Sequence, residues 1–275
     1  MIDLHCHVLP GIDDGPQTIE ESLAMVRVAA DAGTRVLVAT PHVNRRYENR
    51  VSGIAPLVAE LNRRVREESL AVEIRSGAEV ALLGAADLAA EELLGLRLGG
   101  GPWLLVEPPT APVEVDVEGL IMALLDQGHR VLLAHPERCP AFRRDPGALA
   151  SLVGEGVLAS VTTASLRGHF GEDVARFALE LLRSELVQNV SSDAHHHELR
   201  PPTMLEELDR AGLAALAEWL TTKVPEAILE GTEIPQRPLV RAPQQTRSTW
   251  VRREPTAARA GGASPRPAPP PASSR

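Results

Sequence analysis

The feature that most constrains the fold of this chain is an alternation that runs through about its first 230 residues. Short runs rich in valine and leucine are each followed by a longer stretch whose apolar residues recur at helical spacing. The short runs lack a strict apolar–polar alternation, which is typical of parallel strands that are covered on both faces. We therefore expect strands over residues 2–4, 35–39, 72–76, 103–106, 130–134, 158–161 and 186–190.

The longer stretches predict amphipathic helices. The first begins with Thr18 followed three residues later by Glu21, a capping-box pattern, and ends at Gly33. Further helices are expected over 54–68, 113–126, 146–155, 171–184 and 204–211. Repeated strand–helix units favour a parallel sheet with right-handed crossovers. Seven of them predict an α/β fold, a distorted TIM-like (β/α)7 barrel one unit short of the usual eight, with an open doubly wound sheet as the alternative.

The composition changes after about residue 235. Residues 1–235 carry the alternating pattern, whereas residues 236–275 are dominated by Pro, Arg, Ala and Ser and end near a run of prolines. Such a segment has too little apolar surface to fold, so we expect a disordered tail that either is solvated or contacts an acidic partner. Because the tail is basic, the remainder is more acidic than the net charge of −9 suggests. An acidic body argues against nucleic-acid binding and suits a protein that binds divalent cations.

Two cysteines, Cys6 and Cys139, provide no disulfide framework, so a reducing, cytoplasmic setting is expected. The chain has no apolar run that approaches the length of a transmembrane helix, and its start does not resemble a signal peptide. We expect no membrane span.

Potential metal ligands follow six of the seven expected strands. Because the carboxyl ends of the strands in a parallel barrel meet at one face, these side chains are expected to gather there. Imidazoles and carboxylates without a cysteine pair favour hard to borderline divalent ions, and their number exceeds the needs of a single ion. The candidate ligands are His5, His7, either Asp13 or Asp14, His42, Glu79, Glu107, His135, Asp193 and His195.

The opening of the chain is the most specific of these ligand patterns. His5 and His7 are two residues apart, so in an extended strand their side chains point to the same side. Asp13 and Asp14 follow on a turn rich in Gly and Pro, which can aim a carboxylate at the same place. Spacing alone does not decide which of the two aspartates faces the imidazoles.

The opening, with its His-x-His-x-Leu-Pro-Gly-x-Asp-Asp-Gly-Pro pattern, resembles motif I of the PHP (polymerase and histidinol phosphatase) superfamily. The strings Ala-Thr-Pro-His ending at His42, His-Pro-Glu-Arg from His135 and Ser-Asp-Ala-His ending at His195 are similar to one branch of it. That branch is the CpsB/YwqE family of manganese-dependent bacterial protein-tyrosine phosphatases. The resemblance covers about residues 1–230 and includes the stretch that ends with Phe170 and Gly171.

The resemblance implies a PHP-type barrel that holds three divalent ions. Mn²⁺ is the expected metal, with Fe²⁺, Zn²⁺, Mg²⁺ or Co²⁺ as alternatives, and bound ions would activate water for attack on phosphorus. The implied ligand groups are His5, His7, Glu79 and Asp193 for one ion; Glu79, Glu107 and His135 for the second; and Asp14, His42 and His195 for the third.

Arg138 and Arg200 match family arginines that would grip the phosphate. The implied substrate is a phosphotyrosine protein, such as the tyrosine autokinase that controls capsule or exopolysaccharide export. Some family members associate through early helices. Arg63, Arg64 and Arg66 would offer such a homo-oligomer face or simply a solvated one.

Several other interpretations remain open from the residues. Arg138 would serve equally as an ion-pair partner of Glu137, and Asp193 with His195 would suit a helix N-terminus. Cys139 is not followed by arginine at the Cys-x5-Arg spacing of cysteine phosphatases, and Cys6 should point away from the site. A PHP phosphatase of a small phosphomonoester such as histidinol phosphate is the rival enzyme. A catalytically silent, metal-stabilised scaffold that uses its tail is the rival from another class.

Overall fold

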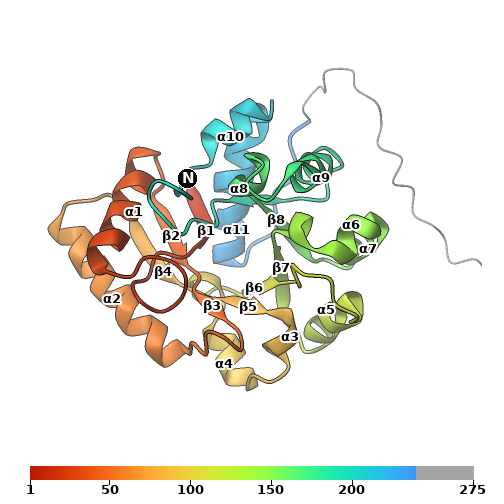
Figure 1. The fold of residues 1–275 in the computed structure, drawn as a ribbon, viewed down its shortest axis with the longest axis horizontal. Coiled ribbons are helices and arrows are strands. Elements are labelled where there is room, and N and C mark those ends of the chain that lie inside the picture. The colour runs from red at the N-terminus through yellow and green to blue at the C-terminus, as the bar shows by residue number, and fades with distance from the viewer. Residues whose placement is uncertain (240–275) are drawn as a thin grey trace, which may run out of the picture.

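The computed structural model describes residues 1–239 and contains short parallel strands surrounded by helices, shown in Figure 1. The strands are β1 (Ile2–Cys6), β2 (Val36–Ala39), β3 (His42–Val43), β4 (Glu73–Ser76), β5 (Glu79–Ala81), β6 (Trp103–Glu107), β7 (Arg130–Ala134), β8 (Leu158–Thr162) and β9 (Asn189–Ser191). All the pairs that these strands form are parallel.

The helices lie mainly around the outside of the strands (Figure 1). The α-helices are α1 (Ile19–Asp31), α2 (Val51–Glu67), α3 (Leu82–Ala85), α4 (Ala90–Gly95), α5 (Val117–Asp126), α6 (Pro140–Arg144), α7 (Pro146–Gly154), α8 (Thr163–Leu166), α9 (Glu172–Arg183), α10 (Leu205–Arg210) and α11 (Val224–Glu230). Shorter 3-10 turns are η1 (Leu98–Gly100), η2 (Pro136–Arg138) and η3 (Ala214–Leu216), and η4 (Trp219–Lys223) is a π-helical turn that leads into α11.

The strands form two sheets that together make a closed ring. One sheet has the order β1-β2-β4 and the other the order β3-β5-β6-β7-β8-β9. Chain continuity joins them, since β3 follows β2 and β5 follows β4 after two residues each. The ring closes between the first and last strands, where the Asp193 amide donates to the His5 carbonyl at 2.8 Å and the His7 amide donates to the Ala194 carbonyl at 2.8 Å. The predicted barrel is therefore confirmed, and the open doubly wound sheet is excluded.

The ends of the elements differ from the sequence prediction for local reasons. The second strand is interrupted at Pro41, which has no amide hydrogen to donate, and resumes as β3 at His42. The helix expected over 113–126 begins only at Val117, because the Asp116 side chain accepts from the Gly119 amide and caps it there. The Thr18 hydroxyl caps α1 as predicted, but Glu21 reaches the Gln17 amide rather than that of Thr18.

The core is built mainly from aliphatic side chains of the strands and of the inner faces of the helices. Leu4, Leu37, Leu104 and Leu132 on the strands are fully buried, as are many of the helical leucines that cover them. Cys6 and Cys139 are both buried and unpaired. None of the helices in the described region is long and apolar enough to cross a membrane.

Two predictions about the periphery remain predictions. The C-terminal end of the long helix α2 carries the expected arginines, and Arg63 and Arg64 form surface ion pairs with Glu60, Glu67 and Glu20. Whether that face binds a second copy stays a prediction. The disorder expected for the basic tail concerns residues that lie almost entirely outside the described range 1–239.

Candidate metal centre

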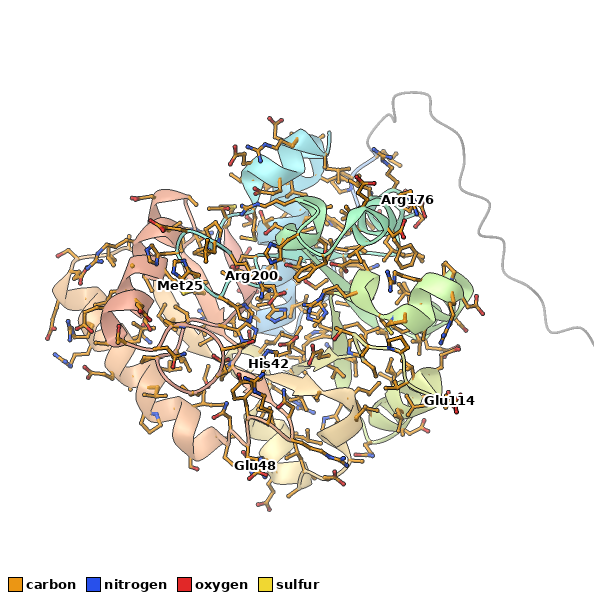
Figure 2. The ribbon with its side chains drawn as sticks, viewed as in Figure 1. Met25, His42, Glu48, Glu114, Arg176 and Arg200 are labelled. Carbon is orange, nitrogen blue, oxygen red and sulfur yellow. The ribbon has the colours of Figure 1, made fainter. Side chains whose placement is uncertain are left out.

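All nine predicted ligands lie at the same end of the barrel. His5 and His7 lie on and just after β1, His42 and Glu79 begin β3 and β5, and Glu107 ends β6. Of the remaining four, His135 follows β7, Asp193 and His195 follow β9, and Asp14 comes from the turn after β1. Figure 2 shows His42 near the centre of the molecule, with Arg200 close above it in this view.

The innermost group contains His5, His7, Glu79 and Asp193, all of which are buried. The His5 and His7 Nε2 atoms are 3.1 Å apart. The Glu79 Oε2 atom lies 3.4 Å and 3.3 Å from these two nitrogens, and the Asp193 Oδ1 atom lies 3.5 Å and 3.6 Å from them. Ligand atoms about 2.1 Å from one metal ion are separated by about 3.0–3.4 Å, so this spacing suits a shared ion.

Glu79 extends the centre to a second group. Its Oε1 atom lies 2.8 Å from His135 Nε2, and the same imidazole nitrogen is 4.0 Å from Glu107 Oε1. Its Oε2 atom is buried and has no hydrogen-bond partner within the described chain, although it lies 2.9 Å from His42 Nδ1. A buried carboxylate oxygen that faces three imidazoles without a hydrogen bond is the arrangement expected of a metal ligand.

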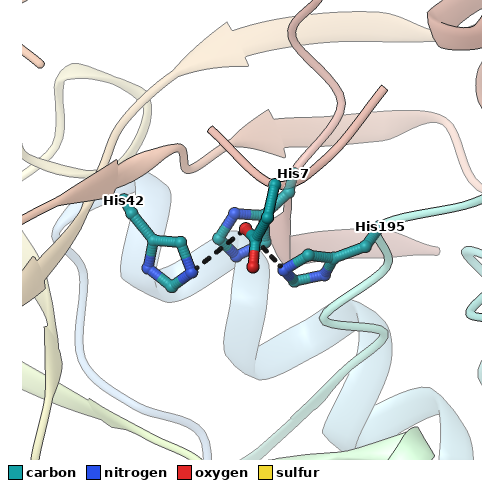
Figure 3. A group of neighbouring side chains, drawn as sticks. His7, His42 and His195 are labelled. Atoms are coloured by element: carbon teal, nitrogen blue, oxygen red, sulfur yellow. Dashed lines mark ion pairs between the residues drawn. The ribbon is translucent and has the colours of Figure 1, made fainter. Parts of the chain in front are cut away.

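The third group forms around Asp14. Its Oδ1 atom lies 3.4 Å from His42 Nε2 and 3.3 Å from His195 Nε2, and Figure 3 shows both imidazoles turned toward that carboxylate, with His7 beside them. The Asp14 side chain is 47% exposed, so this group lies at the mouth of the site. The residues therefore fit three ions that share one face, with Glu79 between them.

The neighbouring aspartate has a different role. Asp13 Oδ2 lies 2.8 Å from His7 Nδ1 and also accepts from the His42 amide at 3.1 Å. This contact leaves the opposite nitrogen of His7 free to face the ligand group. At metal sites a carboxylate commonly binds the far nitrogen of a ligand histidine and fixes its orientation in this way. Spacing left the choice between Asp13 and Asp14 open. In the structure Asp14 faces the imidazoles of the ligand group, whereas Asp13 lies on the far side of His7.

Hydrogen bonds outside the ligand groups also join the first and last strands of the barrel. The Asp3 carboxylate is fully buried; its Oδ1 atom accepts from the amides of His5 at 3.3 Å and of Ser192 at 3.1 Å, and its Oδ2 atom accepts from the Ser192 hydroxyl. The Ser192 hydroxyl in turn accepts from the Ala194 amide at 3.1 Å. Asp3 therefore fixes the strand that carries His5 relative to the loop that carries Asp193. Sequence reasoning missed it, because a single aspartate in a short apolar strand gives no signal of its partner.

The backbone is strained at two ligand positions. His135 and Asp193 have φ values of 31° and 50°, which are left-handed conformations that residues other than glycine rarely adopt. Such strain persists only where the surroundings impose it, and it clusters at functional sites. No helix begins at Asp193, so its interpretation as a helix cap is wrong.

The electrostatics reflect the dense packing of charges. Burial lowers the pKa of His42, but the nearby carboxylates of Asp14 and Glu79 outweigh it and raise that pKa to about 11. Burial and the nearby charge of Glu79 raise the pKa of Glu107 to about 8. Hydrogen bonds from His195 and His42 hold the pKa of Asp14 far below its usual range. A protonated His42 would thus offset part of the carboxylate charge, a task that divalent ions would take over.

Two arginines lie on the Asp193 side of the centre. Arg200 Nη2 is 2.7 Å from Asp193 Oδ2, and Arg138 Nη1 is 3.4 Å from the same oxygen. Both guanidinium groups lie over the Phe170 ring, at 5.5 Å and 4.1 Å from its centroid. The alternative pairing of Arg138 with Glu137 does not form, because Glu137 is buried and accepts from the Thr162 amide instead. The aromatic support of the arginines was not predicted from the sequence.

The two cysteines are not placed for chemistry. Cys6 is buried in the barrel wall, and among the described residues it belongs to none of the groups of neighbouring ligand atoms. Burial raises the pKa of both thiols, that of Cys6 by a large amount, so neither is primed as a thiolate nucleophile.

Comparisons with known proteins find a family model and individual relatives that are similar to this chain. The family model described as "Capsular polysaccharide synthesis, CpsB/CapC" matches residues 1–229. Tyrosine-protein phosphatase YwqE of Bacillus subtilis (strain 168) is 36% identical over 203 residues, which are 73% of this chain and 79% of the relative. Tyrosine-protein phosphatase CpsB of Streptococcus pneumoniae is 26% identical over 215 residues, which are 76% of this chain and 88% of the relative.

A solved structure is similar over most of its length. It belongs to a study of YwqE from Bacillus subtilis and CpsB from Streptococcus pneumoniae, which describes them as unique metal-dependent tyrosine phosphatases. It superposes with a TM-score of 0.76 at 32% sequence identity and covers 88% of this chain and 100% of the solved one.

Proposed function

This chain belongs to the CpsB/CapC family of capsular polysaccharide synthesis, and from that premise we propose that it hydrolyses phosphotyrosine on proteins in a metal-dependent reaction. The observation that carries the proposal is the convergence of nine imidazole and carboxylate ligands beside two arginines. Relatives that are named tyrosine-protein phosphatases support it. We further propose Mn²⁺ as the metal, three ions per chain, and a tyrosine kinase of capsule or exopolysaccharide export as the substrate.

The roles of the residues follow from their positions. Bound divalent ions would supply positive charge to the phosphate oxygens and lower the pKa of a coordinated water. Arg138 and Arg200 lie beside Asp193, where their guanidinium groups can bind phosphate oxygens that approach the same edge. Phe170 holds both side chains in place through its ring face. A tyrosine phenolate, whose conjugate acid has a pKa of about 10, leaves without the strong general acid that an alkoxide would need.

The openness of the site favours a protein substrate over a small metabolite. Asp14 is half-exposed, and His42 and Glu107 are partly exposed, whereas the His5 and His7 group lies beneath them. A phosphorylated side chain presented from a protein surface can reach such a mouth. The proposal includes a reducing compartment, since both cysteines are unpaired.

The test is hydrolysis of p-nitrophenyl phosphate by the full chain with and without Mn²⁺, followed by matched phosphotyrosine and phosphoserine peptides. We expect Mn²⁺-dependent activity that favours phosphotyrosine. Substitution of a residue that only supports a metal ligand typically lowers activity by about 10–100-fold. Changing Asp193 or His42 to Ala should lower kcat/KM by more than that. Activity toward a small phosphomonoester such as histidinol phosphate, with none toward phosphotyrosine, would support the metabolite phosphatase instead. A lack of hydrolysis with every metal would refute the enzyme altogether.

A further inference from the structure

The loop between β3 and α2, residues 44–50, is positively charged and lies beside the metal centre. It directly follows His42, one of the ligands grouped around the half-exposed Asp14. In Figure 2 the loop residue Glu48 lies on the opposite side of His42 from Arg200, so the loop and that arginine flank the centre on different sides. The charged residues of this β3–α2 loop are Arg45, Arg46, Glu48 and Arg50.

The β3–α2 loop is anchored to the two segments that carry Asp14 and His42. The Asn49 side-chain amide donates to the His42 carbonyl at 2.8 Å and to the Ile12 carbonyl at 3.0 Å. Ile12 lies on the same turn as Asp14. The Asn44 side chain closes the loop on itself, because its Oδ1 atom accepts from two backbone amides at 2.9 Å each. The charges of the loop are therefore held in a fixed place relative to the metal ligands.

A stack of three side chains leads from the metal centre to solvent. The Tyr47 ring lies nearly parallel to the His42 imidazole, with an interplanar angle of 8° and ring centroids 5.8 Å apart. The exposed Arg46 guanidinium lies over the Tyr47 ring, 4.9 Å from its centroid, which is within the range of cation–π attraction. Because this contact already restricts the Arg46 side chain, binding of a ligand there costs less conformational entropy than at an unsupported surface arginine.

The charge of this stack has no acidic partner in the described part of the chain. Elsewhere on the surface, Arg27 and Arg63 pair with glutamates at 2.7 Å and 2.6 Å. By contrast, within residues 1–239 no carboxylate oxygen lies within 4.0 Å of the guanidinium nitrogens of Arg45 or Arg46. The chain has a net charge of −9, so an acidic ligand would be repelled by most of its surface and attracted to this loop.

We propose that the β3–α2 loop binds acidic residues that flank the phosphotyrosine of the substrate protein, with Arg46 as the main contact. This inference rests on the proposed function. Through Tyr47, the Arg46 guanidinium lies at most about 11 Å from the His42 ring, a distance that about three residues of extended chain can span. A carboxylate so placed would form a charge-assisted hydrogen bond with the guanidinium. The loop would thus select among phosphotyrosine sites by the charge of their neighbours.

The experiment compares Arg46→Glu with the unmodified full chain, both saturated with Mn²⁺. The substrates are two phosphotyrosine peptides whose flanking residues are all glutamate or all glutamine, and the readout is the ratio of their kcat/KM values. We expect the unmodified protein to prefer the glutamate peptide by about fivefold, as for a well-formed exposed ion pair. Arg46→Glu should abolish or reverse this preference, and Arg46→Lys should keep most of it. The preference should also shrink at about 1 M salt, where the Debye length is about 3 Å.

The matched control is Arg66→Glu, which changes the net charge equally. Arg66 is exposed near the far end of α2, about 22 Å along the helix from the loop, so its replacement should leave the ratio unchanged. Equal hydrolysis of the two peptides by the unmodified protein would overturn the proposal. So would a ratio that Arg46→Glu leaves intact, or one that Arg66→Glu lowers as much. Failure of the proposed function would appear differently, as absence of hydrolysis of both peptides by the unmodified protein.

Discussion

At the scale of single residues, position rather than type decides what each acidic side chain does. Asp13 and Asp14 are adjacent and chemically identical, yet Asp13 lies against the far nitrogen of His7, whereas Asp14 faces His42 and His195 from the front. Their residue types and their turn could be predicted from the sequence. Their division of roles could not, because it depends on how a short turn folds back over a strand.

This difference predicts unequal effects of the same substitution. Asp14→Asn should remove the ion held with His42 and His195, so bound Mn²⁺ should fall by about one per chain. Asp13→Asn should keep the full number at saturating metal but weaken affinity by about 10–100-fold, because it changes only the orientation and basicity of His7. Metal content at several free Mn²⁺ concentrations distinguishes the two. Loss of an ion in Asp13→Asn with none lost in Asp14→Asn would reverse the assignment.

At the scale of elements, the turn between β1 and α1 leaves no room for a side chain at one of its positions. A Cβ atom on Gly15 would lie 2.4 Å from the His7 carbonyl oxygen, and the Gly15 amide donates to Asp13 Oδ1. The turn then leads into the Thr18 cap of α1. The elements and most of their ends could be predicted from apolar spacing and capping residues. The close approach of Gly15 could not, since it joins the turn to a strand that precedes it.

Gly15→Ala should therefore lower the free energy of unfolding by about 1–3 kcal/mol and weaken metal binding, because the added methyl group displaces the His7 backbone. The matched control is Gly53→Ala. Gly53 lies inside α2 with no atom within 4 Å of the added Cβ, so alanine there should raise stability by about 0.5–1 kcal/mol. Denaturant unfolding of both variants provides the measurement. Equal effects of the two changes would contradict the close approach.

At the scale of the whole molecule, the fold and the site depend on the same ring closure. The first and last strands meet through Asp3 and Ser192, which are 189 residues apart in the chain. Repetition of strand and helix indicated the barrel, and the residue types at the strand ends indicated the metal face. The contacts that close the ring could not be predicted, because single polar residues within apolar strands look alike whether or not they have a partner.

Asp3→Ala should act on both the stability and the metal centre. It leaves the Ser192 hydroxyl and two buried amides without their acceptor, so the free energy of unfolding should fall by at least about 2 kcal/mol. Weaker Mn²⁺ binding should accompany that loss, because His5 and Asp193 flank the closure. Thermal unfolding and metal titration check both. Normal metal affinity in a destabilised Asp3→Ala would show that the closure serves the fold alone.

Removal of metal should affect the entire barrel rather than one segment. The ligands lie on or just after β1, β3, β5, β6, β7 and β9, so bound ions would tie together strands from both sheets. Chelation should lower the midpoint of thermal unfolding in one cooperative transition, and excess Mn²⁺ at about 100 times its Kd should restore about 2.7 kcal/mol. Calorimetry with and without chelator measures the shift. An unchanged midpoint would indicate that the ligands do not bind ions in the folded protein.

The most direct test of the metal-dependent phosphatase is a titration of the metal-free full chain with Mn²⁺. Bound metal per chain and phosphotyrosine-peptide hydrolysis would be measured in the same samples. We predict that hydrolysis is absent without metal, rises as the ions bind and reaches its plateau near three Mn²⁺ per chain. Full activity in the chelated protein, or a plateau of activity at one ion per chain, would contradict the shared three-ion face.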